Sequence, residues 1–346
     1  MKGSMTRRWA ASANGYRWLE AGLSQSPVAT RASSPKLHPG LHKLDVEKSW
    51  LHVEDDCFAR DMLLKELVFG DPGERDDVLV VGAEPEAEWE VWELVSAFLT
   101  RKFPETFTKV DGTAVRASRG DYDRVVDAAK TTPLEAASLL AQEDFFILNH
   151  DRLVSAACVF SFGAVRRRTR ERQSLDELHA KVGGYRRDLA TIVTKAITTV
   201  ATKSPMWRSN WSFSLSDSMR PTPDRDFLNL EKRTTVHGET DGPTDFVEAK
   251  VAALARLRAD GIGENLFCKI EFQTLRRLPR SQRVLFTVHT YVEPFNRLTP
   301  RAATHLATNI RLATDHDISL YKNLEDPDVT DVILRYLDDK ATEGRP

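Results

Sequence analysis

The stretch from Lys269 to Pro294 contains two long strand-like runs, KIEFQTL and VLFTVHTYVEP, joined by the basic turn RRLPRSQR. β-Branched and aromatic residues are frequent in both runs, and the turn between them is polar and contains a proline. This pattern predicts two adjacent strands of a sheet.

Two further strand pairs are predicted upstream. FTKVDGTAVRA centres on Asp111-Gly112, a pair typical of a type I′ hairpin turn, and we expect the sheet to begin there. The second pair, FFIL and LVSAACVFSF, flanks Asn149-His150-Asp151. Its strands are apolar enough to be largely buried, with His150 exposed in the turn.

Capping residues mark the helices between these strands. Thr132 precedes Pro133 and a helix that should end near Gln142, and Ser174 with Glu177 forms a capping box for a short helix. Helices alternate with strands along the chain, so we predict the α+β class, with an antiparallel sheet and flanking helices. Further helices are predicted over EPEAEWEVWELVSAFLTRKF, after Gly183-Gly184, from Thr299-Pro300 and from Asp326-Pro327.

Length and charge narrow the class of protein. A chain of 346 residues fits one elaborated domain, which we place at residues 44–346 with a surface insertion at about 216–263. The formal net charge of -2 gives no overall basic field, so nucleic-acid binding is not expected. No apolar stretch approaches the roughly 18 residues that a membrane helix needs, and no secretory signal is recognisable. We therefore expect a cytoplasmic protein that is not bound to a membrane.

The first 43 residues differ in composition from the rest of the chain. They contain one acidic residue, Glu20, against seven lysines and arginines, with many serines and alanines. Two interpretations remain open: a disordered N-terminal tail over residues 1–43, or a transit segment that would direct the protein to mitochondria.

The three cysteines, Cys57, Cys158 and Cys268, are far apart and form no CxxC pair. This spacing fits a reducing compartment and excludes a zinc knuckle or an iron–sulfur cluster built from this chain alone. The sequence also lacks the GxGxxG, GxxxxGK[ST], HExxH and GxSxG motifs, which argues against nucleotide-dependent dehydrogenases, NTPases, zincins and α/β-hydrolases. A redox reaction would therefore need electrons from outside.

Six sequence blocks carry a resemblance to a known family. They are PGLHKLDVEKSWLHVEDD, LLAQEDFFILNHDRLVSAACVFSF, ELHAKVGGYRRDL, PMWRSNWSF, IEFQTLRRLPRSQRVLFTVHTYVEP and YKNL, over roughly residues 39 to 338. In this order they resemble the haem oxygenase subunits of the haem-dependent oxidative N-demethylase family. The most specific pieces are QTLRRLPRS before an FT strand and QEDF before DRLV.

The resemblance implies a PAS-like sheet, with haem b in a pocket between the sheet and the helices. It implies a monooxygenase that uses O2 to oxidise a C–H bond next to nitrogen in a small amine or N-alkylated metabolite. The resulting carbinolamine would release an aldehyde and the dealkylated amine. Because the chain has no flavin or nicotinamide fingerprint, electrons are expected from a separate NAD(P)H-dependent reductase, with peroxide as the alternative oxidant.

By resemblance, His179 is the axial ligand of the haem iron, and Tyr185 is the tyrosine that accompanies it in the family. A neutral imidazole whose second nitrogen is hydrogen-bonded is a good iron ligand. A histidine beside a leucine on a short helix is also often a packed residue. The alternative ligand, or a hydrogen-bond partner for bound O2, is His289, whose strand face includes Leu285, Thr287 and Tyr291.

The acidic residue that the family has just before QTLRR falls on Glu271, which the resemblance makes the catalytic acid–base group. Facing a closed pocket, its carboxylate would pair with an alkylammonium ion and take its proton. Glu271 alternates with Ile270 and Phe272 along the strand, so a solvent-facing carboxylate is the alternative.

Basic residues are candidates for cofactor binding. Arg276, Arg277 and Arg280 cluster at the hairpin turn, and arginine forks can bind the two propionates of haem. Arg208 and Asn210 in WRSNW are further candidates for the rim of the pocket. Charged residues at a turn are also commonly just solvated.

Two alternative functions remain open. One is a non-catalytic haem-binding PAS-like sensor or carrier, since a PAS-type fold does not itself dictate enzymology. The other is a haem-free domain that binds a small metabolite in the same pocket.

Overall fold

The computed structural model describes most of the chain from residue 40 onward. The predicted surface insertion at about 216–263 lies mostly outside the described residues. The described residues are 14–23, 28–29, 36–37, 40–161, 173–179, 185–215, 217–219, 255, 257, 261–313, 324 and 327–343.

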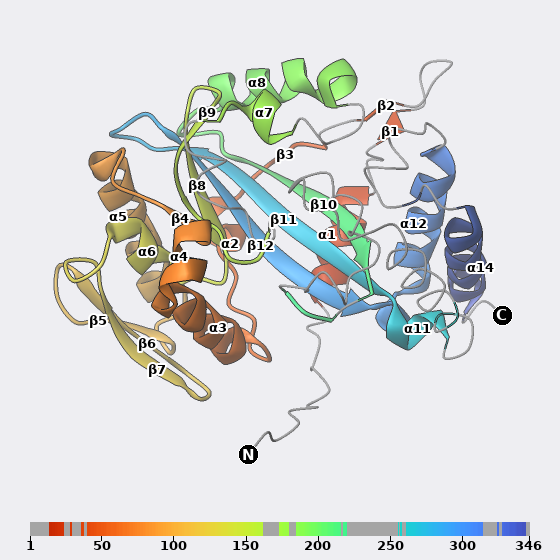
Figure 1. Ribbon diagram of the computed structural model, residues 1–346, viewed down its shortest axis with the longest axis horizontal. Coiled ribbons are helices and arrows are strands. Elements are labelled where there is room, and N and C mark those ends of the chain that lie inside the picture. Colours follow the sequence, from red (N-terminus) through yellow and green to blue (C-terminus); the bar gives the residue numbers. More distant parts are fainter. Residues whose placement is uncertain are drawn as a thin grey trace.

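Seven strands form an antiparallel sheet at the centre of the molecule (Figure 1). The predicted hairpin supplies two 11-residue strands, β11 (Phe267–Arg277) and β12 (Val284–Pro294), which pair along their whole length. The α+β class and the antiparallel sheet with flanking helices are thereby confirmed. In spatial order the strands are β3 (His42–Lys43), β10 (Met206–Ser214), β11, β12, β8 (Asp144–Asn149), β9 (Arg152–Ala157) and β4 (Leu79–Val80).

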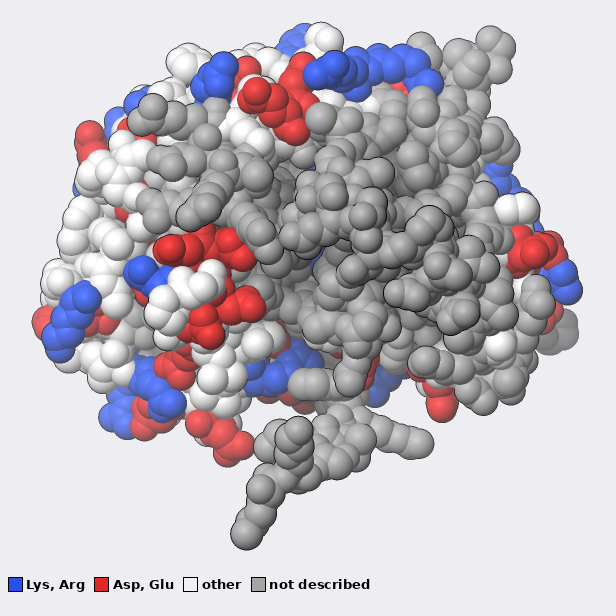
Figure 2. All heavy atoms as spheres, in the orientation of Figure 1, with Lys and Arg blue, Asp and Glu red and all other residues white. Residues whose placement is uncertain are grey.

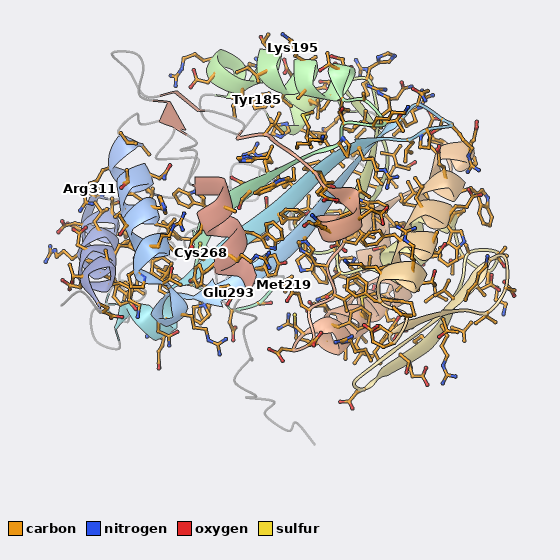
Figure 3. The ribbon with its side chains drawn as sticks, turned by 180° about the vertical axis from the view of Figure 1, so that it is seen from behind. Tyr185, Lys195, Met219, Cys268, Glu293 and Arg311 are labelled. Atoms are coloured by element: carbon orange, nitrogen blue, oxygen red, sulfur yellow. The ribbon has the colours of Figure 1, made fainter. Side chains whose placement is uncertain are left out.

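Alternate residues of each strand point to opposite faces of this central sheet. We name the α1 face after helix α1 (Asn14–Leu23), which lies across it (Figure 3), and the α8 face after helix α8 (Ala190–Thr199). On the α1 face, Phe272 belongs to the main hydrophobic core. On the α8 face, Leu275 packs with residues of α8 in a second core cluster. Each face therefore has its own core.

Helix α1 lies within the segment for which the sequence predicts a disordered tail, and here the structure differs from that prediction. Tyr16 and Leu19 are buried in the main core. Gly15 and Gly22 allow the helix to approach the strands closely: a Cβ on Gly22 would lie 2.5 Å from the Cβ of Ser209. The buried stripe thus combines large apolar residues with glycines, and composition alone does not reveal it. The transit interpretation stays a prediction.

The first predicted hairpin belongs to a second, three-stranded sheet instead of the central one. The hairpin itself is confirmed, but its type I′ turn is wrong because neither Asp111 nor Gly112 has a positive φ angle. The Asp111 carboxylate instead accepts hydrogen bonds from the backbone N–H groups of Thr113 and Ala114, each at 2.8 Å, and so closes the loop. In spatial order this sheet contains β5 (Phe107–Lys109), β6 (Ala114–Arg119) and β7 (Tyr122–Asp127).

The second predicted hairpin is confirmed as β8 and β9, with His150 exposed in its turn at φ 54°. The helix before it, α6 (Pro133–Ser138), is shorter than expected and ends before Gln142. The ammonium group of the buried Lys65 donates to the carbonyl oxygens of Ala141 and Glu143 in the connection. Those carbonyls are satisfied without further helical turns.

Helices pack against both faces and both ends of the central sheet (Figure 1). Capping predicted from the sequence is confirmed where Ser174 and Glu177 form a capping box and where Thr299 caps its helix. Outside the sheets, β1 (Val28–Ala29) pairs with β2 (Lys36–Leu37). The other described helices are α2 (Val46–Ser49), α3 (Phe58–Gly70), α4 (Pro72–Val78), α5 (Pro85–Lys102), α7 (Leu175–Leu178), α11 (Ile262–Asn265), α12 (Pro300–Leu312) and α14 (Pro327–Thr342), with a π-helical turn at Tyr185–Leu189 and a 3-10 turn at Phe295–Arg297.

Within the described part of the chain, every helix is too short or too polar to cross a membrane. Figure 2 shows acidic and basic side chains interspersed over the described part of one molecular surface. This mixture agrees with the formal net charge of -2.

Candidate active site

Glu271 lies in the middle of β11 and points to the α8 face. Its Oε2 atom accepts hydrogen bonds from Nε2 of Gln273 at 2.9 Å and from Nδ2 of Asn210 at 3.3 Å. Asn210 is its cross-strand neighbour on β10, and Gln273 is two residues along β11, so the three side chains share one face. The side chain of Glu271 is half-buried. The sheet thus holds one carboxylate oxygen between two amide donors.

Two buried polar atoms beside Glu271 have no hydrogen-bond partner among the described residues. One is Nε of Arg208, the cross-strand neighbour of Gln273. The other is the hydroxyl oxygen of Thr290, the cross-strand neighbour of Glu271 on β12. Leaving such a group buried and unpaired costs about 1–3 kcal/mol. Their position next to the carboxylate indicates a place where a polar ligand would be bound.

His179 is the C-cap residue of α7, on the same side of the sheet as Glu271. Helix α7 packs there because Leu175 belongs to the α8-face core. The Nδ1 atom of His179 donates to the carbonyl oxygen of Leu175 at 2.8 Å, so Nε2 is the ring nitrogen that offers a lone pair in the neutral form. The ring stacks on Tyr185, with the ring centres 4.4 Å apart and the planes 8° from parallel. Figure 3 labels Tyr185 beneath α8.

The three arginines of the hairpin turn do not gather at Glu271. Arg276 points to the α1 face, where its guanidinium lies 4.5 Å from the centre of the Trp50 ring. Arg277 points to the α8 face but donates to backbone carbonyl oxygens at the end of α8. Arg280 forms an ion pair of 2.6 Å with a glutamate of α5. Each of these contacts holds a neighbouring element against the hairpin.

His289, the alternative ligand, points to the α1 face, away from Glu271. Its cross-strand neighbour is Phe272, and its side chain is 2% exposed. The Nδ1 atom lies 2.9 Å from Oε1 of Glu143. Burial opposes a charge on this ring, but the charge and hydrogen bond of Glu143 outweigh it and raise the pKa of His289. The two histidines predicted from the sequence therefore lie on opposite sides of the sheet.

A comparison with protein families matches residues 40–332 to the family described as haem-dependent oxidative N-demethylase, alpha subunit-like. The chain belongs to this family. The match spans most of the sequence and confirms the resemblance carried by the sequence blocks. A comparison with curated proteins finds no match. Membership of this haem-dependent N-demethylase family indicates a haem-dependent oxidative enzyme.

The residues of the α8 face fit a haem group. His179 has one ring nitrogen hydrogen-bonded to its own helix, an arrangement that would orient the ring as a metal ligand. Arg208 has a buried guanidinium nitrogen of the kind that pairs with a propionate. Burial raises the pKa of Tyr185 to about 12, so its hydroxyl, buried without a partner among the described residues, stays protonated as a donor.

The sequence prediction does not include Gln273 or Thr290. Gln273 could have been found, because it stands two residues from Glu271 on a predicted strand and therefore on the same face. Thr290 could not, because its place opposite Glu271 depends on the register of β11 with β12.

Proposed function

We propose that this protein is a haem-dependent monooxygenase that removes an N-alkyl group from a small amine, with its active site on the α8 face. One observation carries the proposal: a carboxylate held by two amides and flanked by unpartnered polar atoms lies on the side of the sheet where His179 is placed. Family membership supplies the reaction class.

Glu271 is the catalytic residue in this proposal. Its carboxylate pairs with the alkylammonium form of the substrate and takes a proton from it, which leaves a neutral amine beside Glu271. Asn210 and Gln273 hold Oε2 in place by their amide N–H bonds, so the carboxylate meets the substrate in one orientation.

Bound haem b would supply dioxygen activation and the oxidation of the C–H bond next to nitrogen. His179 would hold the iron through Nε2, since its Nδ1 is bonded to Leu175, and stacking on Tyr185 would restrict rotation of the ring. Arg208 would pair with a propionate. Arg276, Arg277 and Arg280 have other contacts, so we assign them to the fold.

Electrons would come from a separate NAD(P)H-dependent reductase. The three cysteines are buried and form no disulfide bond, and the one group of metal-binding side chains among the described residues includes none of them. The amine substrate and O2 complete the set of partners in this proposal.

The visible spectrum of the full chain expressed with a haem precursor tests this function. We expect a stoichiometric Soret band that shifts when the reduced protein binds CO, and consumption of O2 with aldehyde release when an amine and a reductase are added. Haem binding without turnover of any small N-alkyl amine would favour the sensor or carrier. A protein that takes up no haem would leave the metabolite-binding alternative.

A further inference from the structure

Three ionisable side chains from distant parts of the chain meet on the α1 face, behind the sheet from Glu271. His52 comes from the segment after α2, Glu143 immediately precedes β8, and His289 lies in β12. One donor atom of each side chain lies within 4.8 Å of the other two. We call these three residues the His–Glu–His cluster.

Hydrogen bonds fix the tautomer of His52. The hydroxyl of Tyr291 donates to Oε1 of Glu54 at 3.0 Å, so its oxygen accepts from Nδ1–H of His52 at 2.8 Å. With the proton on Nδ1, Nε2 carries a lone pair. That Nε2 atom is buried without a partner among the described residues. His52 therefore presents a bare nitrogen acceptor inside the protein.

Glu143 presents a bare oxygen acceptor in the same way. Its Oε1 atom accepts the backbone N–H of His52 at 2.8 Å and lies 2.9 Å from Nδ1 of His289. Its Oε2 atom is buried without a partner among the described residues. Nδ1 of His289 faces the same carboxylate, and it supplies the third lone pair when an ion replaces the hydrogen bond to Oε1.

Buried acceptors that face no donor indicate a cation between them. Two imidazoles and one carboxylate form the donor set that proteins use for zinc and for non-haem ferrous iron. The outer contact of His52 also matches that of a metal ligand, because its Nδ1–H is given to the hydroxyl oxygen of Tyr291, which fixes the orientation of the ring. We propose that the His–Glu–His cluster binds one divalent transition-metal ion, separate from the haem of the α8 face.

The surroundings of the cluster make this ion a structural one. The ring of Trp18 in α1 stacks on His52, with centres 5.0 Å apart and planes 9° from parallel, and Phe272 lies 4.6 Å from the same ring. Helix α1 therefore lies over the cluster (Figure 3). The ion would tie three distant segments together beneath α1, and it would enter before α1 docks.

Metal analysis of refolded protein tests the proposal. The full chain is unfolded, refolded with one equivalent of Zn2+ and freed of loose metal by gel filtration. We expect close to one zinc ion per chain, and visible ligand-field bands when Co2+ replaces Zn2+. Glu143→Gln, which keeps the shape and an acceptor oxygen, should lose the bound zinc. Haem does not interfere, because its iron is counted separately.

Two further variants distinguish a ligand set from a folding defect. Tyr291→Phe keeps the ring but removes the hydroxyl that orients His52, so zinc affinity should fall about 10- to 100-fold. His150→Asn changes an exposed histidine at a turn with positive φ, where asparagine is tolerated, and should keep full zinc content. Circular dichroism confirms that each variant is folded.

The opposite results would overturn the proposal. If folded wild-type protein retains no zinc or cobalt, the cluster is an ion pair between protonated His289 and Glu143. If zinc is retained equally by wild type, Glu143→Gln and Tyr291→Phe, the metal is held elsewhere on the chain. Since the proposal concerns the α1 face, loss of haem binding by the protein leaves it standing.

Discussion

The two faces of the central sheet use neighbouring residues of the same strands in opposite ways. On the α8 face, Glu271 is half-buried and its carboxylate is held by neutral amides beside unpartnered polar atoms. On the α1 face, His289 and Glu143 are enclosed by the main core and bonded to each other. Polar residues with similar chemistry thus have different partners and different burial on the two faces, and strand register decides on which face each one lies.

The largest difference between the faces is expected in stability. Glu143→Ala should lower the free energy of unfolding by about 3–5 kcal/mol, because it removes one partner of a buried pair and leaves His289 without its carboxylate. Glu271→Ala should cost less than about 1 kcal/mol, because Glu271 is half-buried and its partners are neutral amides. Urea denaturation of the two haem-free variants measures both costs. If both variants lost a similar amount of unfolding free energy, the two faces would not differ in their contribution to stability.

The next largest effect is expected on turnover. Glu271→Gln should slow amine oxidation by roughly 100-fold, the lower range for loss of a general acid–base group, and should leave the haem spectrum unchanged. Asp123→Asn is the control, since that carboxylate forms an exposed ion pair in the three-stranded sheet. Steady-state rates of wild type and both variants are measured between about pH 6 and about pH 9, in steps of about one pH unit. An unaltered pH profile in Glu271→Gln would remove the acid–base role.

Docking of α1 on its face should depend on glycine. Gly22→Val places a side chain where even a Cβ would lie 2.5 Å from Ser209, so we expect a loss of about 1–3 kcal/mol of stability. Gly70→Ala is the matched control, because a Cβ there meets nothing within 4 Å. Thermal unfolding of both variants provides the test. A Gly22 variant as stable as the control would show that α1 does not depend on this close approach.

The smallest effect concerns Glu293, which lies under α1 and is labelled in Figure 3. Burial raises its pKa from the ordinary 4.5 to about 8. Between these two pH values the folded state binds more protons than the unfolded state. The contribution of this carboxyl group to the free energy of unfolding is therefore full below about pH 4.5 and is lost as the pH rises through about 8. Glu293→Gln should therefore lose less stability than wild type between about pH 6 and about pH 9.

The control for this titration is Glu264→Gln, at an exposed glutamate of α11. Melting temperatures at the two pH values are compared within each variant, so that other titrating groups cancel. A Glu293 variant that loses as much stability as the control would mean that Glu293 is already ionised in the folded protein.

The sequence predicts those parts of the fold that depend on local patterns. The hairpin of β11 and β12, the hairpin at His150 and the capping box at Ser174 follow from strand alternation, turn residues and side-chain caps, and all are confirmed. Helix α1 does not follow, because its buried stripe uses Gly15 and Gly22 to approach a sheet that local sequence cannot reveal.

The candidate site also depends on long-range contacts that sequence patterns do not predict. Glu271 and Asn210 are candidates from the family blocks, and strand register makes them cross-strand neighbours whose side chains are hydrogen-bonded on the α8 face. The partnership of His52, Glu143 and His289 has no counterpart in sequence spacing, since these residues are brought together by long-range packing. Most chains contain many histidines and carboxylates that are far apart in sequence. Only the folded structure shows which of them are in contact.

The central claim is that haem is held on the α8 face, and the choice between the two histidines tests it most directly. Visible spectra of ferric, reduced and CO-bound protein are recorded for wild type, His179→Ala and His289→Asn, each reconstituted with one equivalent of haem. We predict that haem affinity falls by more than roughly 100-fold in His179→Ala, because losing a ligand costs more than losing a residue that only orients a ligand. Folded His289→Asn should keep the wild-type spectrum. A wild-type spectrum in His179→Ala, with haem lost from His289→Asn, would place the cofactor on the α1 face and contradict the account.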